Sequence, residues 1–326
     1  MSAQGRIVLD VRGLTIGLAH AGRARPLVDD LSFEVAEGEM LAFVGESGSG
    51  KSLTAAAIFG LLPFGVRRLA GSIHLHDTVL TALPEPALRA RRGRDMGLVF
   101  QNPLTALNPS RGIRAQIAET YRVHRGGTRR AAQKRLRALL TEVGLAHAAD
   151  GPETYPHQLS GGMRQRAMIA MALVCDPTLL IADEPTTALD VVVQAQILDL
   201  LARLRRERGL AVVFITHDLA LAASRADRIL VLYAGRGIEE GRAADFFEAP
   251  RHPYSRALRD AVPPLHGHGG RLAEIPGLPP GPGALPAGCR FAPRCPNARD
   301  DCRQNEPAMR RTEPRFACFH PCPEAP

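Results

Sequence analysis

A glycine-rich stretch, residues 45–52, has the residue types and spacing of a phosphate-binding loop. It reads Gly45, Glu46, Ser47, Gly48, Ser49, Gly50, Lys51 and Ser52. In the pattern G-x-x-x-x-G-K-[ST], glycines let backbone N–H groups turn around a phosphate, the lysine reaches the outer phosphates and the hydroxyl ligates Mg²⁺. Only Lys51 and Lys134 are lysines among the 41 basic residues. Position 51 is therefore expected to require a compact ammonium rather than a planar guanidinium.

Two adjacent carboxylates follow an apolar run at residues 179–182. At a strand end, Asp183 can hold Mg²⁺ or its water, and Glu184 can polarise the attacking water of an in-line phosphoryl transfer. A second anion-binding candidate lies at the start of an expected helix, where Ser160, Gly161 and Gly162 offer a hydroxyl and backbone N–H groups. The sequence thus predicts a site for nucleotide phosphates and Mg²⁺.

The elements that must position these residues follow an α/β order. An apolar run at 39–44 precedes the glycine loop, and an Ala-rich helical stretch at 51–61 follows it. Continuous apolar runs, typical of strands covered on both faces, lie at 179–182, 211–216 and 229–233. The other predicted strands are 7–14, 31–35, 73–75 and 96–100, and the predicted helices are 163–175, 191–208 and much of 103–171.

The motif order resembles that of the ATPases of ATP-binding-cassette (ABC) transporters, over about residues 5–248. The resemblance implies that Gln101 contacts Mg²⁺ or water and senses a membrane subunit, and that His217 contacts the γ-phosphate of ATP. It also implies that Ser160 and Gly162 clamp the γ-phosphate held by a second ATPase subunit. Asp190 would lie at the interface of the two subunits.

Other stretches resemble the ATPases of bacterial dipeptide and oligopeptide importers: residues 101–109, 155–166 and 252–255, and the cysteine-bearing tail. The implied activity is ATP hydrolysis that energises peptide import from the cytoplasmic face of the inner membrane, where the subunit would be peripheral. The implied partners are a second ATPase subunit, two transmembrane permease subunits and an extracytoplasmic peptide-binding protein. Leu18 lies where the family usually has an aromatic side chain against adenine.

Three rival functions are weighed against this one. An importer of nickel or another small solute would keep the enzyme and change the cargo. Soluble ABC proteins that act on DNA or ribosomes typically have two cassettes or long inserted arms, and this chain has neither pattern, so we expect no nucleic-acid partner. A non-enzymatic structural partner with an inactive ATP site is disfavoured because the expected site residues are all present: Lys51, Asp183, Glu184 and His217.

The expected fold class is α/β, an ABC-type nucleotide-binding domain with a mixed sheet, an antiparallel β subdomain and a helical subdomain. This domain is predicted to span residues 1–248. Composition changes near residue 249, and 16 of the 26 prolines lie in residues 250–326. We therefore predict a Pro- and Cys-rich C-terminal extension over 249–326, with a flexible joint at residues 266–270.

Five of the six cysteines lie in that tail, whereas Cys175 lies in an apolar segment and is expected in the core. Cys289, Cys295, Cys302 and Cys318 could supply four thiolates to a [4Fe–4S] cluster or to zinc. The short C-x₂-C spacing of zinc ribbons is absent, which favours iron–sulfur, and free thiols are the third possibility. Cys322 is expected to be a spare thiol or a replacement for Cys318.

The 326 residues are 45% apolar and 23% charged, which excludes global disorder. The net charge of +8 permits anionic partners without selecting one. No apolar run approaches the roughly 18 residues of a membrane helix, and the first residues lack the apolar stretch of a signal peptide. The chain is therefore expected in the cytoplasm.

Overall fold

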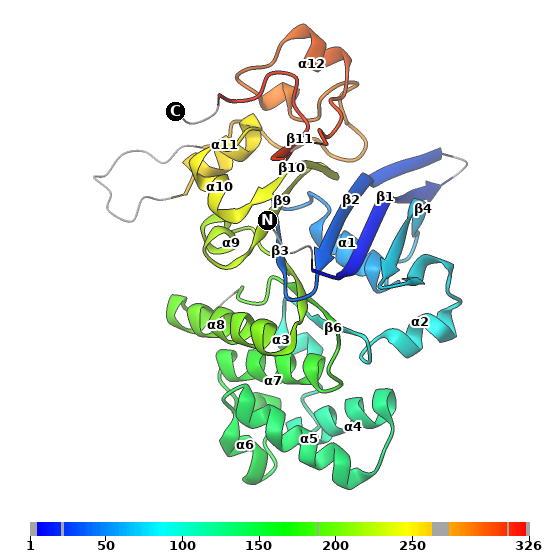
Figure 1. Cartoon of the computed structure of the whole chain (residues 1–326), viewed down its shortest axis with the longest axis vertical. Helices are drawn as coiled ribbons and strands as arrows, with labels where there is room; N and C mark the ends of the chain where they lie inside the picture. Colours follow the sequence, from blue (N-terminus) through cyan, green and yellow to red (C-terminus); the bar gives the residue numbers. More distant parts are fainter. Residues whose placement is uncertain (1–4, 21–22, 188, 263–273, 312, 324–326) are drawn as a thin grey trace. The chain divides into compact units, whose positions relative to one another are not determined.

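The computed structural model describes residues 5–20, 23–187, 189–262, 274–311 and 313–323 (Figure 1). The chain forms two compact units. Unit 1 comprises Met1–Leu9, Val35–Glu39 and Ala82–Val213, and unit 2 comprises Asp10–Glu34, Met40–Thr81 and Phe214–Pro326. The predicted joint at residues 266–270 lies outside the described residues.

Unit 2 contains most of a four-stranded sheet in the order β2-β1-β4-β5. Its strands are β1 (Ile7–His20), β2 (Arg23–Ala36), β4 (Val66–Leu75) and β5 (Thr78–Val79). Strands β4 and β5 pair antiparallel, with His74 opposite Val79. Apolar side chains from β1 and β2, such as Leu14, Ile16 and Phe33, are buried.

A second sheet in unit 2 carries the phosphate loop at the end of β3 (Met40–Val44), whose five residues are all buried. Strand β3 pairs in parallel with β9 (Arg228–Tyr233), and β9 pairs antiparallel with β10 (Arg236–Arg242). Strand β11 (Arg315–Phe316), from the tail, pairs antiparallel with β10. The helices of unit 2 are α1 (Lys51–Ile58), α9 (Leu219–Arg225), α10 (Ala243–Glu248), α11 (Pro253–Asp260) and α12 (Asp300–Gln304), with 3₁₀ turns η1 (Leu80–Ala82) and η3 (Ala292–Arg294).

Unit 1 joins parallel strands to a helical region. Strand β6 (Met96–Val99) pairs in parallel with β7 (Leu179–Asp183). The first residues of β8 (Ala211–Ile215) continue this sheet, since the Ala211 N–H donates to the Thr178 carbonyl at 3.0 Å. The helices are α2 (Glu85–Arg91), α3 (Pro103–Ala106), α4 (Ile113–Arg125), α5 (Arg129–Glu142), α6 (Ala146–Asp150), α7 (Gly161–Leu173) and α8 (Val191–Arg208), with the 3₁₀ turn η2 (Pro156–Gln158).

The predicted fold class is confirmed, with a mixed sheet, an antiparallel β pair and a helical region. Helix α8 has the predicted bounds because local signals fix both ends: the Asp190 side chain accepts from the Val193 N–H, and Gly209 follows in the left-handed conformation. The sequence pattern did not predict β10 or β11. In the tail, α11 forms despite the many prolines because Pro253 occupies its first position, where no N–H is required.

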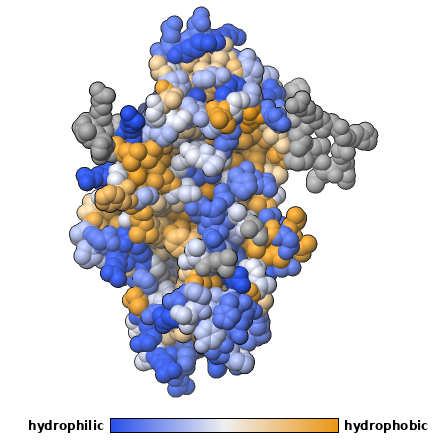
Figure 2. Space-filling model, turned by 180° about the vertical axis from the view of Figure 1, so that it is seen from behind, coloured by the Kyte–Doolittle hydropathy of each residue, from blue (hydrophilic) through white to orange (hydrophobic). Residues whose placement is uncertain are grey.

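The surface in Figure 2 shows hydrophobic areas separated by hydrophilic ones, and the lower end of the view is mostly hydrophilic. Within the part of the chain that the structure describes, no helix combines the length and apolar character needed to cross a membrane.

Candidate functional site

The phosphate loop of unit 2 encloses the ammonium of Lys51. This side chain begins α1 and is only 6% exposed. Its Nζ donates to the carbonyl oxygens of Gly45 at 2.6 Å and Glu46 at 2.9 Å, and contacts Ser49 Oγ at 3.3 Å. Three oxygens thus converge on one point-like cation, a geometry that suits a compact ammonium better than a planar guanidinium.

Gly45 shows why this loop requires glycine at its first position. Its φ is +153°, and a Cβ added there would lie 2.1 Å from the carbonyl oxygen of Leu232. A side chain would therefore push the loop away from β9. Farther along the loop, Ser47, Gly48 and Ser52 are exposed, so the loop presents backbone and hydroxyl groups to a ligand.

The carboxylates of unit 1 lie at the end of β7, as predicted. Gln101 Nε2 donates to Glu184 Oε2 at 2.8 Å, and Thr187 Oγ1 donates to the same oxygen at 2.9 Å. The structure thus brings together two predicted catalytic residues that are 83 positions apart in the chain. Glu184 also has φ +45°, a conformation that L residues rarely adopt and that is often found at functional sites.

Ser160, Gly161 and Gly162 form the start of α7 in unit 1. Ser160 is the N-cap, and its exposed hydroxyl accepts from the Met163 N–H at 3.3 Å. A Cβ on Gly162 would lie 2.5 Å from Val193 Cγ1, so the start of α7 packs closely against the start of α8. This close packing fixes the predicted anion-binding turn beside Asp190, the N-cap of α8.

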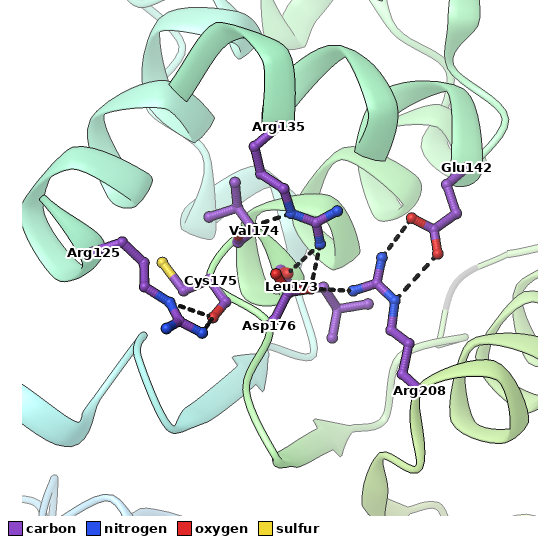
Figure 3. Close-up of polar contacts among 8 residues, drawn as sticks. All are labelled: Arg125, Arg135, Glu142, Leu173, Val174, Cys175, Asp176 and Arg208. Atoms are coloured by element: carbon purple, nitrogen blue, oxygen red, sulfur yellow. Dashed lines mark hydrogen bonds and ion pairs between the residues drawn. The ribbon is translucent and has the colours of Figure 1, made fainter. Parts of the chain in front are cut away.

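Three arginines hold the other end of α7 (Figure 3). Arg125 of α4 donates to the Cys175 carbonyl, with Nε at 2.8 Å. Arg135 of α5 donates to the carbonyls of Val174 at 3.2 Å and Leu173 at 3.3 Å. Arg208 of α8 pairs with Glu142 and Asp176. The carbonyls of Leu173, Val174 and Cys175, at the end of α7 and just after it, thereby gain donors, and this end of α7 is tied to its neighbouring helices.

His217 lies in unit 2, two residues after the end of β8, and is exposed. The next residue, Asp218, is the N-cap of α9 and accepts from the Leu221 N–H at 2.9 Å. Leu18, in the place where the family usually has an aromatic residue, is 40% exposed on β1. Lys51 and His217 are therefore residues of unit 2, whereas Gln101 and Glu184 are residues of unit 1.

The four tail cysteines of the predicted metal site line one small cavity in unit 2, of about 10 Å³. They are Cys289, Cys295, Cys302 and Cys318. Burial raises the pKa of Cys295 to about 11 and that of Cys318 to about 12. These thiols therefore stay protonated at neutral pH unless a cation among them stabilises the thiolates.

The other two cysteines differ from this group. Cys175 is fully buried in unit 1, which confirms the prediction of a core residue, and burial raises its pKa to about 11. Cys322 is buried but does not line the four-cysteine cavity. It lies in a neighbouring hollow that Cys295 also lines.

Sequence reasoning missed several residues next to these sites. Arg294 pairs with Glu46 of the phosphate loop, and Tyr254 accepts from the Glu46 N–H. Beside Cys302, the ligand atoms of Asp301, Cys302 and His320 lie within 4.8 Å of one another. The only feature of the sequence that could have drawn attention to them is that Arg294 directly precedes Cys295 and Asp301 directly precedes Cys302. Nothing in the sequence indicated which distant residue each would contact.

Two family profiles match the chain. The ABC transporter family matches residues 28–187, and the C-terminal region of the oligopeptide/dipeptide transporter family matches residues 238–302. The first match contains the phosphate loop, Gln101, residues 160–162 and the carboxylates of Asp183 and Glu184. The second match reaches into the cysteine-bearing tail.

Named relatives are similar over nearly their whole length. The dipeptide transport ATP-binding protein of Haemophilus influenzae is 46% identical, with 93% of this chain and 92% of that protein aligned. The oligopeptide transport ATP-binding protein of Salmonella typhimurium is 45% identical over 98% and 95% of the two chains. A putative peptide import ATP-binding protein of Brucella ovis is 48% identical over 93% of each.

Solved structures give the same result for the fold. A dimeric ATP-binding cassette in a post-hydrolysis state, bound to ADP and Pi, superposes with a TM-score of 0.64 at 27% identity. The superposition covers 72% of this chain and 98% of the chain in that structure. A cassette of a Clostridium perfringens ABC transporter complex gives 0.65 at 26% identity, with 74% and 91% covered.

Proposed function

Because the chain belongs to the ATP-binding proteins of ABC transporters, we propose that it is the ATP-hydrolysing subunit of an importer of dipeptides or oligopeptides. Relatives aligned over more than nine tenths of their length are named for dipeptide, oligopeptide or peptide transport. The match of the tail to the oligopeptide/dipeptide transporter family supports the same cargo. The observation that carries the proposal is the Gln101–Glu184 contact at the end of β7. The sequence also contains a complete phosphate-loop motif.

The phosphate loop is proposed to hold ATP. Its residues, 45–52, would surround the β- and γ-phosphates with backbone N–H groups, and Lys51 would exchange loop carbonyls for phosphate oxygens. Ser52, Gln101 and Asp183 are the residues that would hold Mg²⁺, and their hydroxyl, amide and carboxylate oxygens suit that ion. When bound, Mg²⁺ supplies neutralisation of phosphate charge.

Glu184 is proposed as the general base that removes a proton from the attacking water. The hydrogen bonds from Gln101 Nε2 and Thr187 Oγ1 fix one carboxylate oxygen and orient the other. Gln101 can also position the water, and His217 is proposed to contact the γ-phosphate. These roles require no movement of protons beyond the transfer from water to Glu184.

A second ATPase subunit is proposed to complete the site through Ser160, Gly161, Gly162 and Asp190. Two apolar side chains directly after Asp190 support an interface in this place: Val191 is 79% exposed and Val192 is 66% exposed. Neighbouring large apolar side chains with that exposure are typical of interaction surfaces.

The remaining partners are proposed to be two transmembrane permease subunits and an extracytoplasmic peptide-binding protein. The chain would then be peripheral, on the cytoplasmic face of the cell membrane. Residues 1–248 are proposed as the ATPase domain and residues 249–326 as an importer-type extension.

The test is reconstitution of the chain with its permease subunits and binding protein in vesicles. We expect ATP hydrolysis to rise several-fold when short peptides are added with the binding protein. Stimulation by nickel instead of peptides would replace the proposed cargo, and absence of Mg²⁺-dependent ATP hydrolysis in the assembled complex would contradict the proposed enzyme.

We also propose that the four cavity cysteines hold a metal centre, a [4Fe–4S] cluster. Four thiolates suit such a cluster, and their spacing lacks the short pairs of zinc ribbons. The supporting observation is that all four line one cavity although they are spread over 30 residues. Zinc is the alternative ion that four thiolates can hold.

Metal analysis of anaerobically purified protein distinguishes the [4Fe–4S] cluster from zinc. A brown protein with about four irons per chain supports the cluster, and a colourless protein with one zinc supports the alternative. Replacement of Cys302 by Ser should remove the metal, whereas Cys175→Ser, in unit 1, should not. Ready alkylation of all four thiols in the native protein would contradict both metals.

A further inference from the structure

The cysteine-bearing tail contacts the phosphate loop through one buried ion pair. Arg294, in the turn η3 directly before Cys295, has a side chain that is 4% exposed. Its Nη1 lies 2.7 Å from Glu46 Oε2, and its Nη2 lies 3.0 Å from Glu46 Oε1. The two parallel bonds form the bidentate arrangement that fixes both orientation and distance.

Every polar group of Glu46 has a partner. Its N–H donates to Tyr254 Oη at 3.0 Å, and its carbonyl accepts from Lys51 Nζ at 2.9 Å and from the Ser49 N–H at 3.2 Å. Its carboxylate is taken by Arg294. Two of these partners, Arg294 and Tyr254, lie beyond residue 249, so the tail region holds the second residue of the loop from outside.

The tail residues that hold Glu46 are themselves rigidly placed. Arg294 also donates to the Pro276 carbonyl at 2.8 Å and to Tyr233 Oη at 3.2 Å. The rings of Tyr233 and Tyr254 lie 4.6 Å apart, and Phe291 packs against both at 5.3 Å. The hydrogen bond to Glu46 raises the pKa of Arg294 further above its ordinary value, so the guanidinium stays charged.

We propose that Arg294 and Tyr254 are positioning residues that hold the phosphate loop in its ATP-binding conformation. The inference rests on the proposed role of this loop in phosphate binding. Without the two contacts, the loop would keep the bonds around Lys51 but lose those that hold Glu46 from outside. Part of the loop would then have to be ordered when ATP binds, and the cost of that ordering would reduce the binding free energy. The loss should therefore appear in the affinity for ATP and in KM, while kcat changes little because neither residue contacts the reacting atoms.

Arg290 provides a matched control. It lies four residues before Arg294, directly after Cys289, and is also buried, with a side chain that is 7% exposed. It pairs with Asp29 and Glu306 and donates to the Ala234 carbonyl at 2.6 Å. It therefore anchors the same tail segment without contacting the phosphate loop.

The experiment measures Mg²⁺–ATP affinity of the full-length protein by titration, and KM and kcat of the assembled transporter. Arg294→Gln and Glu46→Gln should each weaken ATP binding about tenfold, within the range expected for coupled neighbours. The double variant should be no weaker than either single variant, because the two changes remove one shared contact. Arg290→Gln should leave ATP affinity within about twofold of wild type, although it lowers thermal stability.

Tyr254→Phe keeps the test decisive if Arg294→Gln does not fold, because it removes only the hydroxyl and keeps the ring. It should weaken ATP binding about threefold, as loss of one neutral hydrogen bond does. Because coupling is reciprocal, ATP should also slow amide hydrogen exchange in residues 289–296 of the wild type, and should not do so in Glu46→Gln.

Unchanged ATP affinity in both Arg294→Gln and Tyr254→Phe would overturn the inference. So would an equal loss in Arg290→Gln, which would indicate general destabilisation of the tail. These results are distinct from a failure of the proposed function: a wild-type complex that does not hydrolyse ATP would refute that function, whereas an active wild type with insensitive variants refutes only the positioning role.

Discussion

Replacement of Arg135 by Met tests whether arginine donors hold the C-terminal end of α7. Met keeps an unbranched apolar side chain of similar length but removes every donor. Arg135 is 21% exposed and bonds the carbonyls of Val174 and Leu173 at 3.2 and 3.3 Å. It also pairs with Asp176 at 2.6 Å, although that carboxylate is 55% exposed.

The expected cost follows from these contacts. Hydrogen bonds from a charged donor contribute about 1.5–3 kcal/mol each, but both carbonyl bonds are long, so about 1 kcal/mol each is the better value. The half-exposed pair with Asp176 adds at most about 0.5 kcal/mol. We therefore expect Arg135→Met to lower the free energy of unfolding by about 2–2.5 kcal/mol.

Arg137→Met is the control on the same helix. Arg137 is 66% exposed and pairs at 3.2 Å with Asp150, which is 72% exposed. Its loss should cost less than about 0.5 kcal/mol. Urea denaturation followed by circular dichroism, with the slopes compared, gives both values. Equal effects of the two substitutions, or a cost below about 0.5 kcal/mol for Arg135→Met, would refute the capping argument.

Three further outcomes are expected. Glu184→Gln should abolish turnover while ATP binding persists, because the amide keeps the shape but cannot accept the proton of water; a near wild-type rate in the assembled complex would contradict the role. Lys51→Arg should lower both ATP affinity and turnover, because three oxygens within 3.3 Å converge on one ammonium; normal transport by this variant would show that charge alone is enough. Asp190→Ala should cost about 1 kcal/mol of stability through loss of the cap of α8, whereas Asp190→Asn keeps the cap, and equal stability of the two in urea denaturation would show that the cap contributes nothing.

Local signals predicted the parts of the site that depend on a few consecutive residues. The phosphate loop follows from its own spacing, and the carboxylates of Asp183 and Glu184 lie at a strand end because the apolar run before them forms β7. The contact between Gln101 and Glu184 could be expected only from the resemblance to a family. The positive φ of Glu184 has no sequence signal, because nothing in its residue type requires that conformation.

Contacts between distant segments could not be predicted in this way. Glu46 and Arg294 are 248 positions apart, and each has many possible partners of opposite charge in this chain. What selects the pair is the path of the tail, in which β11 joins the sheet beside β10 and the aromatic rings of Tyr233, Tyr254 and Phe291 meet. Those are tertiary effects, and a pattern of neighbouring residues does not contain them.

The use of arginine explains why net charge was a weak guide to partners. A guanidinium carries five donors in a fixed plane, so one buried side chain can satisfy several backbone carbonyls at once. Arg135 does this at the end of α7, and Arg166 bonds the Val143 carbonyl at 2.8 Å after α5. Arg294 bonds the carbonyls of Pro276 and Ile275 and also pairs with the carboxylate of Glu46. Such residues add to the count of positive charges while their donors are used inside the protein. The three oxygens that converge on Lys51 suit the opposite geometry, a compact ammonium, and this is where the chain retains a lysine.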